Sequence, residues 1–128
     1  MKIEELVCFE GETLSFDSAK ITSVTLADGG GTVNITGQQP DYGLIYLTYH
    51  LQINPKIETQ GVFHGKALGI GSDGERNTAQ LQGVWVRKGR ETTLYSLDDV
   101  SDGHFYFAVV QLDLENESAE IHFSSLVK

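Results

Sequence analysis

Apolar and polar residues alternate along much of this chain with a period of two, which is the spacing of a β-strand that buries one face. The clearest run is 44–53, where Ile45, Leu47 and Tyr49 share one face. Glycine-rich clusters separate these runs, and glycine supplies the positive φ that tight turns need. The pattern predicts strands near 20–27, 31–36, 43–53, 61–71, 77–88, 91–97, 104–114 and 119–127, with an additional N-terminal segment near 3–8.

The connections between most of these runs are short, so neighbours in sequence are expected to pair as antiparallel hairpins. No segment of ten or more residues shows a period of 3.6. We therefore predict an all-β protein, in which residues 1–128 form a single antiparallel up-and-down β-barrel of about eight strands. No helix longer than about two turns is expected.

Both faces of the run 104–114 are apolar over its middle part. Phe105 and Phe107 lie on one face, whereas Tyr106 and Val110 lie on the other. One face can fill a barrel interior, and the other must then meet a partner subunit or a covering segment. An exposed patch of this kind is unusual on a monomer, so we expect self-association, most simply as a homodimer.

One face of the run 61–71 consists of small residues apart from Phe63, namely Gly61, Gly65, Ala67, Gly69 and Gly71. Glycine normally weakens a strand. This pattern indicates either a sharply coiled strand whose backbone is closely approached, or room left for a ligand inside the barrel. Which face of each strand points inward is left open, because a shift of one residue reverses the answer.

The meander of strands, the glycine-patterned run 61–71 and the Asp73-Gly74 turn after it resemble the allene oxide cyclase-like barrels and, more loosely, the lipocalin-like barrels. The resemblance implies a barrel whose interior can hold one small ligand. The allene oxide cyclase-like superfamily includes plant oxide cyclases and bacterial cyclases of natural-product pathways. No catalytic motif of these families transfers residue by residue, so the resemblance bears on the fold more than on the function.

Composition narrows the classes of partner. The chain has 40% hydrophobic and 21% charged residues, as a globular domain does. Nine Lys and Arg against eighteen Asp and Glu leave a net charge of −9, which disfavours nucleic acid and anionic membrane surfaces. No apolar stretch is long enough for a membrane span. The acidic segment 1–6 lacks the apolar region of a signal peptide, so we expect a cytoplasmic protein, with its single Cys8 buried as a small hydrophobe.

No sequence motif indicates that the protein binds a cofactor. The segment 69–74 matches G-x-G-x-x-G, but it continues into a strand-like run, so a hairpin turn is the better interpretation than a dinucleotide site. The histidines lack metal-ligand spacing, and no metal is expected. Asp98, Asp99 and Asp102 are interpreted as a solvated hairpin tip. No nucleophile elbow, phosphate-binding loop or Cys-x-x-Cys pair is present.

Three functions remain open. The first is a barrel that binds a small, mostly apolar molecule in its interior or at its mouth. The second is a cyclase or isomerase that acts on a flexible polyketide-like or fatty-acid-like substrate without metal or nucleotide. The third is a structural, self-associating module with a filled core. A ligand site would be lined by the runs 43–53, 61–71, 77–88 and 104–114, and its candidate residues are Tyr46, His50, His64, Trp85, Arg87 and Tyr106.

Overall fold

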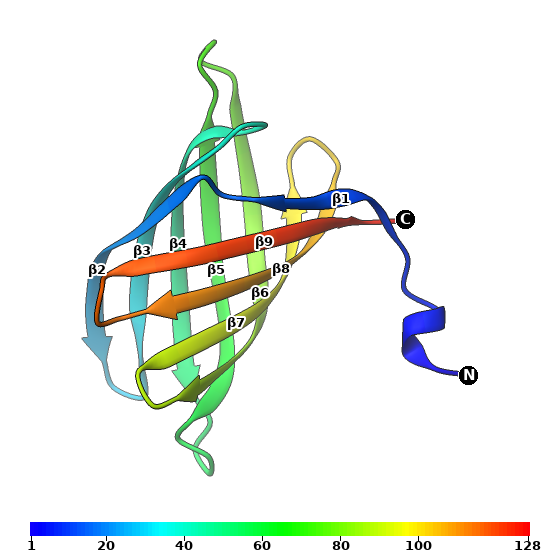
Figure 1. Ribbon diagram of the computed structural model, residues 1–128. Helices are drawn as coiled ribbons and strands as arrows, with labels where there is room; N and C mark the ends of the chain where they lie inside the picture. The colour runs from blue at the N-terminus through cyan, green and yellow to red at the C-terminus, as the bar shows by residue number, and fades with distance from the viewer.

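A computed structural model describes all 128 residues and contains nine strands and one short 3-10 turn (Figure 1). The turn, η1, covers Ile3–Glu5. The strands are β1 (Phe9–Ser15), β2 (Ser18–Ala27), β3 (Gly30–Gln39), β4 (Gly43–Ile53), β5 (Gln60–Ile70), β6 (Arg76–Lys88), β7 (Glu91–Val100), β8 (Phe105–Asp113) and β9 (Ser118–Leu126). The prediction of an all-β chain without a long helix is confirmed.

Strands β2 to β9 pair in sequence order as antiparallel neighbours, and β9 closes the ring. The closing seam is divided between two strands. Lys20 of β2 pairs with Ser118 at the start of β9, whereas β1 pairs with the rest of β9 through Leu14 and Phe123. The result is a closed eight-stranded barrel with one additional strand, as the hairpin pattern predicted, and it is compatible with a lipocalin-like barrel.

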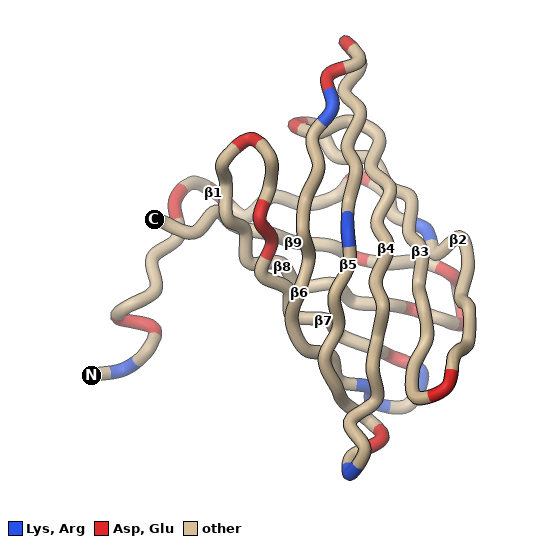
Figure 2. The backbone as a smooth tube through the Cα atoms, turned by 180° about the vertical axis from the view of Figure 1, so that it is seen from behind, with Lys and Arg blue, Asp and Glu red and all other residues tan.

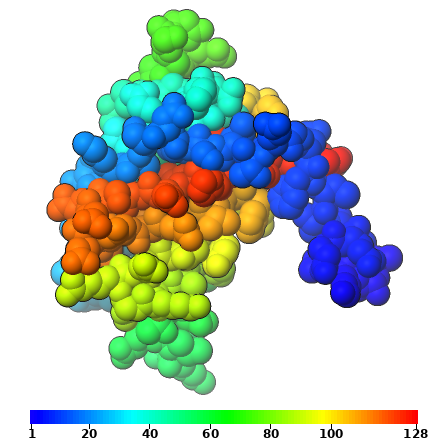
Figure 3. Space-filling model, in the orientation of Figure 1, coloured from blue at the N-terminus to red at the C-terminus, as the bar shows by residue number.

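The N-terminal element differs from the prediction. The segment near 3–8 forms the turn η1 and an exposed connection, and the strand that joins the barrel begins only at Phe9. None of residues 1–8 is buried, and Figures 1 and 3 show this segment projecting from the barrel. Cys8 is exposed, which corrects the expectation of a buried thiol. Residues 3–8 lack the alternation that ties a strand to the core.

The alternating pattern resolves into one inward face for each strand. On β8, Tyr106, Ala108 and Val110 are buried, while Phe105 is 43% exposed. On β4, the buried residues are Ile45, Leu47 and Tyr49. Of the two apolar faces of the run 104–114, the even-numbered one therefore fills the barrel.

The middle of the barrel is packed. Ile35, Leu94 and Val110 are at most 1% exposed, and the Tyr49 ring meets Phe63 edge to face at a centroid distance of 5.5 Å. The barrel is thus closed across its centre, and space for a ligand remains only toward its ends.

Two glycines of β5 allow the backbone of β4 to approach closely, as a sharply coiled strand requires. A Cβ atom at Gly65 would lie 1.9 Å from the Thr48 carbonyl oxygen, and one at Gly61 would lie 1.8 Å from that of Gln52. Only a residue without a side chain fits this close approach of β4 and β5. Of the two interpretations of the run 61–71, coiling accounts for these positions, whereas Gly69 and Ala67 face a cavity.

The only helical element of the structure is the three-residue turn η1, and no helix has the length and hydropathy needed to cross a lipid bilayer.

Candidate functional site

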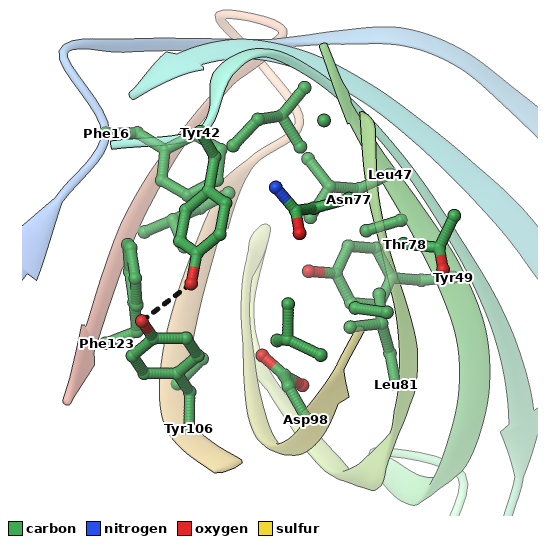
Figure 4. Close-up of a pocket in the computed structure, with 17 residues that line it drawn as sticks. Phe16, Tyr42, Leu47, Tyr49, Asn77, Thr78, Leu81, Asp98, Tyr106 and Phe123 are labelled. Carbon is green, nitrogen blue, oxygen red and sulfur yellow. Dashed lines mark hydrogen bonds between the residues drawn. The ribbon is translucent and has the colours of Figure 1, made fainter. Parts of the chain in front are cut away.

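A cavity of about 70 Å³ lies at the end of the barrel where the β3–β4, β5–β6 and β7–β8 connections gather (Figures 1 and 4). This volume is about half of the ~150 Å³ that lets an engineered apolar cavity take up benzene. It therefore suits a compact molecule or one end of a longer one. Its lining is mainly aromatic and aliphatic and comprises Phe16, Tyr42, Ile45, Leu47, Tyr49, Ala67, Gly69, Asn77, Thr78, Ala79, Leu81, Asp98, Val100, Tyr106, Ala108, Ile121 and Phe123.

Asp98 of β7 is the one charged residue in this lining. It lies between Leu81 of β6 and Tyr106 of β8 in the strand register. Burial raises the pKa of Asp98 to about 6, and a hydrogen bond donated by the Ser96 hydroxyl acts in the opposite direction. No lysine or arginine pairs with the Asp98 carboxylate. Its negative charge is thus balanced only by a neutral hydroxyl.

Tyr49 of β4 brings a second polar group into the cavity. The residue is 2% exposed, and its hydroxyl has no hydrogen-bond partner within the protein. Burial first, and the nearby charge of Asp98 second, raise the pKa of Tyr49 well above its ordinary value. In Figure 4 the Tyr49 hydroxyl and the Asp98 carboxyl point into the same space. Tyr49 is therefore a neutral hydroxyl that can donate to, or accept from, a bound molecule.

A hydrogen-bonded pair of tyrosines forms the opposite wall. The Tyr42 hydroxyl donates to Asp102 Oδ2 at 2.6 Å, and it lies 2.8 Å from the Tyr106 hydroxyl. Because the single Tyr42 proton is directed to Asp102, the Tyr106 hydroxyl donates to Tyr42. Burial and these hydrogen bonds raise the pKa of Tyr42 far above its usual range. For Asp102, burial acts to raise the pKa, but hydrogen bonds from Tyr42 and His104 outweigh it and lower the pKa overall.

The entrance next to this cavity is acidic. A hollow that shares Tyr42 and Asn77 with the cavity is lined also by four carboxylates, those of Asp17, Asp41, Asp73 and Glu75, and by no lysine or arginine. Asp73 and Glu75 belong to the connection between β5 and β6, and Figure 2 shows acidic residues at the end of this long hairpin. The mouth therefore carries negative potential, in keeping with the net charge of −9.

Of the residues predicted from sequence, Tyr106 alone lines this cavity. Trp85 also points inward, but toward the opposite end of the barrel, where its Nε1 donates to the Gln52 carbonyl oxygen at 3.0 Å. Arg87 lies at that same opposite end, exposed, and donates to the Gly89 carbonyl oxygen. Trp85 and Arg87 border an open hollow of about 580 Å³ there.

The other three candidates lie on the outer face of the barrel. Tyr46 is 47% exposed, and His50 and His64 are exposed cross-strand neighbours whose ring centroids are 5.0 Å apart. On β4 the buried set is odd-numbered, so Tyr46 and His50 point outward. The structure therefore does not bring these three residues to the interior.

Sequence reasoning missed Tyr42, Tyr49 and Asp98. Asp98 does not belong to a solvated tip, because β7 extends to Val100 and the turn begins only at Ser101. The pattern that reveals Asp98 is its position two and four residues beyond the buried Ser96 and Leu94, which puts all three on one strand face.

Comparison of the chain with protein-family models, with curated proteins and with solved structures finds no match.

Proposed function

We propose that the barrel binds a small, mostly apolar molecule in the cavity at the Tyr42 end, with the polar group of that molecule held by Asp98 and Tyr49. One observation carries the proposal: a carboxylate without a counterion and a hydroxyl without a partner open onto the same apolar space. Asp98 is hydrogen-bonded only to Ser96 within the protein, and a hydrogen bond to a charged group contributes about 1.5–3 kcal/mol. A ligand that hydrogen-bonds to both groups gains this contribution and fills the apolar volume.

Ligand-observed NMR and calorimetry with a panel of compact molecules test the proposal. Trp85 is the single tryptophan, but its fluorescence reports on the opposite mouth. The variant Ala79→Leu places a larger side chain in the cavity lining and should abolish binding. Val84→Leu, on the outer face of the same strand, is the control and should bind normally. Equal binding by both variants would contradict a site in this cavity.

A cyclase or isomerase is the second candidate, and the chemistry of Asp98 favours it. A carboxyl group with a pKa of about 6 can take up and return a proton near neutral pH. Hydroxyl groups lie in the same cavity to stabilise developing charge on a substrate oxygen. Exchange of α-hydrogens of small ketones in D2O, lost in Asp98→Asn, tests this function.

The outer face supports a proposal of self-association. Val62, Val84 and Tyr95 are register neighbours on β5, β6 and β7, and each is 42–52% exposed. The face of β8 contributes less, because Phe9 of β1 packs on Phe107 with ring centroids 6.3 Å apart. We propose that a homodimer forms through the Val62–Val84–Tyr95 row, since association removes this apolar surface from water.

A further inference from the structure

The cavity holds an uncompensated negative charge. Asp98 is the only formally charged group in the lining, and neither the Arg90–Glu115 ion pair nor the His104–Asp102 contact involves it. A desolvated carboxylate without a counterion is unfavourable, and a cation beside it restores much of the lost stabilisation. A ligand with one positive charge would therefore supply the counterion that Asp98 lacks.

The cavity wall around Asp98 is aromatic. Tyr106 is the cross-strand neighbour of Asp98, and its ring meets Phe123 and Tyr42 edge to face at centroid distances of 4.9 and 6.2 Å. Tyr49 and Phe16 complete the set of aromatic rings. Such rings give an apolar molecule a packing surface, and a cation placed over a ring face gains a further attraction. The walls therefore favour a cation that also carries apolar atoms.

The charge of the entrance also favours a cationic ligand. Its four carboxylates, of which Asp41 and Asp73 are two, form no ion pair with lysine or arginine. A mouth lined by one sign of charge raises the local concentration of the opposite sign and repels its own. Anionic ligands, such as the carboxylates of fatty acids, are therefore disfavoured both by the acidic entrance and by Asp98 in the cavity.

An inorganic cation does not fit. No group of three or more His, Cys, Asp or Glu side chains is placed to hold a metal ion. One carboxylate among aromatic and aliphatic groups cannot replace the oxygen shell of a hydrated ion. The cation must therefore be organic, with the hydrogen-bond donors of an ammonium group and a compact apolar body.

We propose that the cavity selects a small protonated organic amine, whose ammonium group pairs with the Asp98 carboxylate while its apolar part packs among the tyrosine rings. The inference rests on the proposed function, because it names the ligand class of the same cavity. The Tyr49 hydroxyl is the second polar partner, since its oxygen can accept a hydrogen bond from the ammonium group.

Below neutral pH, the affinity for an amine should depend on pH through Asp98. The titratable groups that face Asp98 are Tyr49 from β4, Tyr42 from the β3–β4 connection and Tyr106 from β8, and burial raises the pKa of all three. The neighbours from β6 and β9 are apolar or neutral. Amine affinity should therefore be constant between about pH 7 and 9, where both Asp98 and an alkylammonium group are charged, and fall as the pH decreases through about 6, where Asp98 is protonated.

Three probes of equal length test the inference by calorimetry at pH 7.5: pentylamine, 1-pentanol and pentanoate. We expect pentylamine to bind about tenfold more tightly than 1-pentanol, and pentanoate not to bind. Asp98→Asn should lower the affinity for pentylamine about tenfold and leave 1-pentanol within about threefold. The substitution keeps the shape of the side chain and an oxygen that accepts from Ser96, so the fold should persist. Asp99→Asn is the matched control, because it removes the same charge from the exposed, adjacent position.

The outcomes separate the two proposals. Equal affinities for pentylamine and 1-pentanol, both lost in Ala79→Leu, would keep the binding function and overturn amine selectivity. Amine binding that Asp98→Asn and Asp99→Asn reduce equally would overturn the inference, because it would reflect only the overall negative charge. Absence of binding by all three probes and by their benzyl counterparts would overturn both the function and the ligand class.

Discussion

Asp98 and Tyr106 are direct cross-strand neighbours on β7 and β8, and both side chains line the cavity inside the barrel. The pairing places a carboxylate next to the aromatic ring whose hydroxyl is already engaged with Tyr42. Asp98 therefore keeps its oxygen atoms for Ser96 and for the cavity. A stabilising partner for this carboxylate would have to come from outside the protein.

The first prediction concerns the stability of Asp98→Asn. The pKa of Asp98 is raised from 3.8 to about 6 in the folded state, so the folded protein binds more protons than the unfolded chain between these values. The contribution of Asp98 to stability is thus most favourable below about pH 4 and is lost as the pH rises through about 6. At pH 7.5 the variant should be more stable than the wild type by about 2 kcal/mol.

Urea unfolding at pH 7.5 and pH 4 measures this difference, which should nearly vanish at the lower pH. Asp99→Asn, with its exposed side chain, should change the free energy of unfolding by less than about 0.5 kcal/mol at either pH. A variant Asp98→Asn that is less stable than the wild type at pH 7.5 would mean that the carboxylate already has a favourable partner.

The second prediction concerns the tyrosine wall. Tyr42→Phe removes the hydrogen bonds to Asp102 and Tyr106, and it should lower stability by about 1–2 kcal/mol at neutral pH. The pKa of Asp102 is lowered in the folded state, so its contribution is present above its unfolded value and is lost as the pH falls. The effect of Tyr42→Phe should accordingly be smaller in acid.

Thermal unfolding at pH 7 and pH 3 follows this effect. Tyr46→Phe is the control, since Tyr46 is 47% exposed on the outer face and makes no side-chain hydrogen bond that the substitution would remove. Equal losses in the two variants would show that the Tyr42–Asp102 contact contributes nothing specific.

The fold could be predicted from sequence because its evidence is local. Alternation along 44–53 and turns such as Asp102-Gly103 give strands and hairpins, and short antiparallel connections leave few topologies. The pairing of β1 with β9 could not be predicted from such local patterns. Phe9–Ser15 contains Gly11 at positive φ and a register shift between Glu10 and Leu14, which interrupt the period of two.

The site could be predicted only in part, because it depends on which face of each strand is inward. Tyr46 and Tyr49 belong to one strand, and only the completed barrel shows that Tyr49 is buried and Tyr46 is not. Tyr42 reaches the cavity from a loop, where no period applies. Asp98 lies in an acidic run that resembles a solvated turn, and its partial burial results from the pairing of β7 with β6 and β8.

The third prediction concerns the coiling of β5. Gly65→Ala places a Cβ atom 1.9 Å from the Thr48 carbonyl oxygen, a backbone atom that cannot move without disturbing β4. Gly69→Ala meets its nearest atom, the Tyr42 carbonyl oxygen, at 3.1 Å. We expect Gly65→Ala to lower stability by more than about 3 kcal/mol and Gly69→Ala by about 1 kcal/mol. Denaturant unfolding compares them, and similar small losses would refute close coiling as the role of Gly65.

The fourth prediction concerns self-association through the outer face. A homodimer would bury the row of Val62, Val84 and Tyr95, three exposed residues on neighbouring strands. Light scattering should then give about twice the chain mass of 14.1 kDa at micromolar concentration. Val84→Lys places a charge at the centre of this row, and burying an unpaired charge is strongly unfavourable, so the variant should be a monomer.

Gln80→Lys is the matched control for that experiment. It adds the same charge to an exposed outward position of β6, but it leaves the apolar row intact, so it should remain a dimer. Dissociation of both variants would indicate an electrostatic effect of the added lysine, because the chain carries a net charge of −9 and each substitution changes it equally. A 14.1 kDa wild-type species at micromolar concentration would contradict the dimer directly. The exposed row would then have to be tolerated by a monomer, as scattered surface hydrophobes are in many proteins.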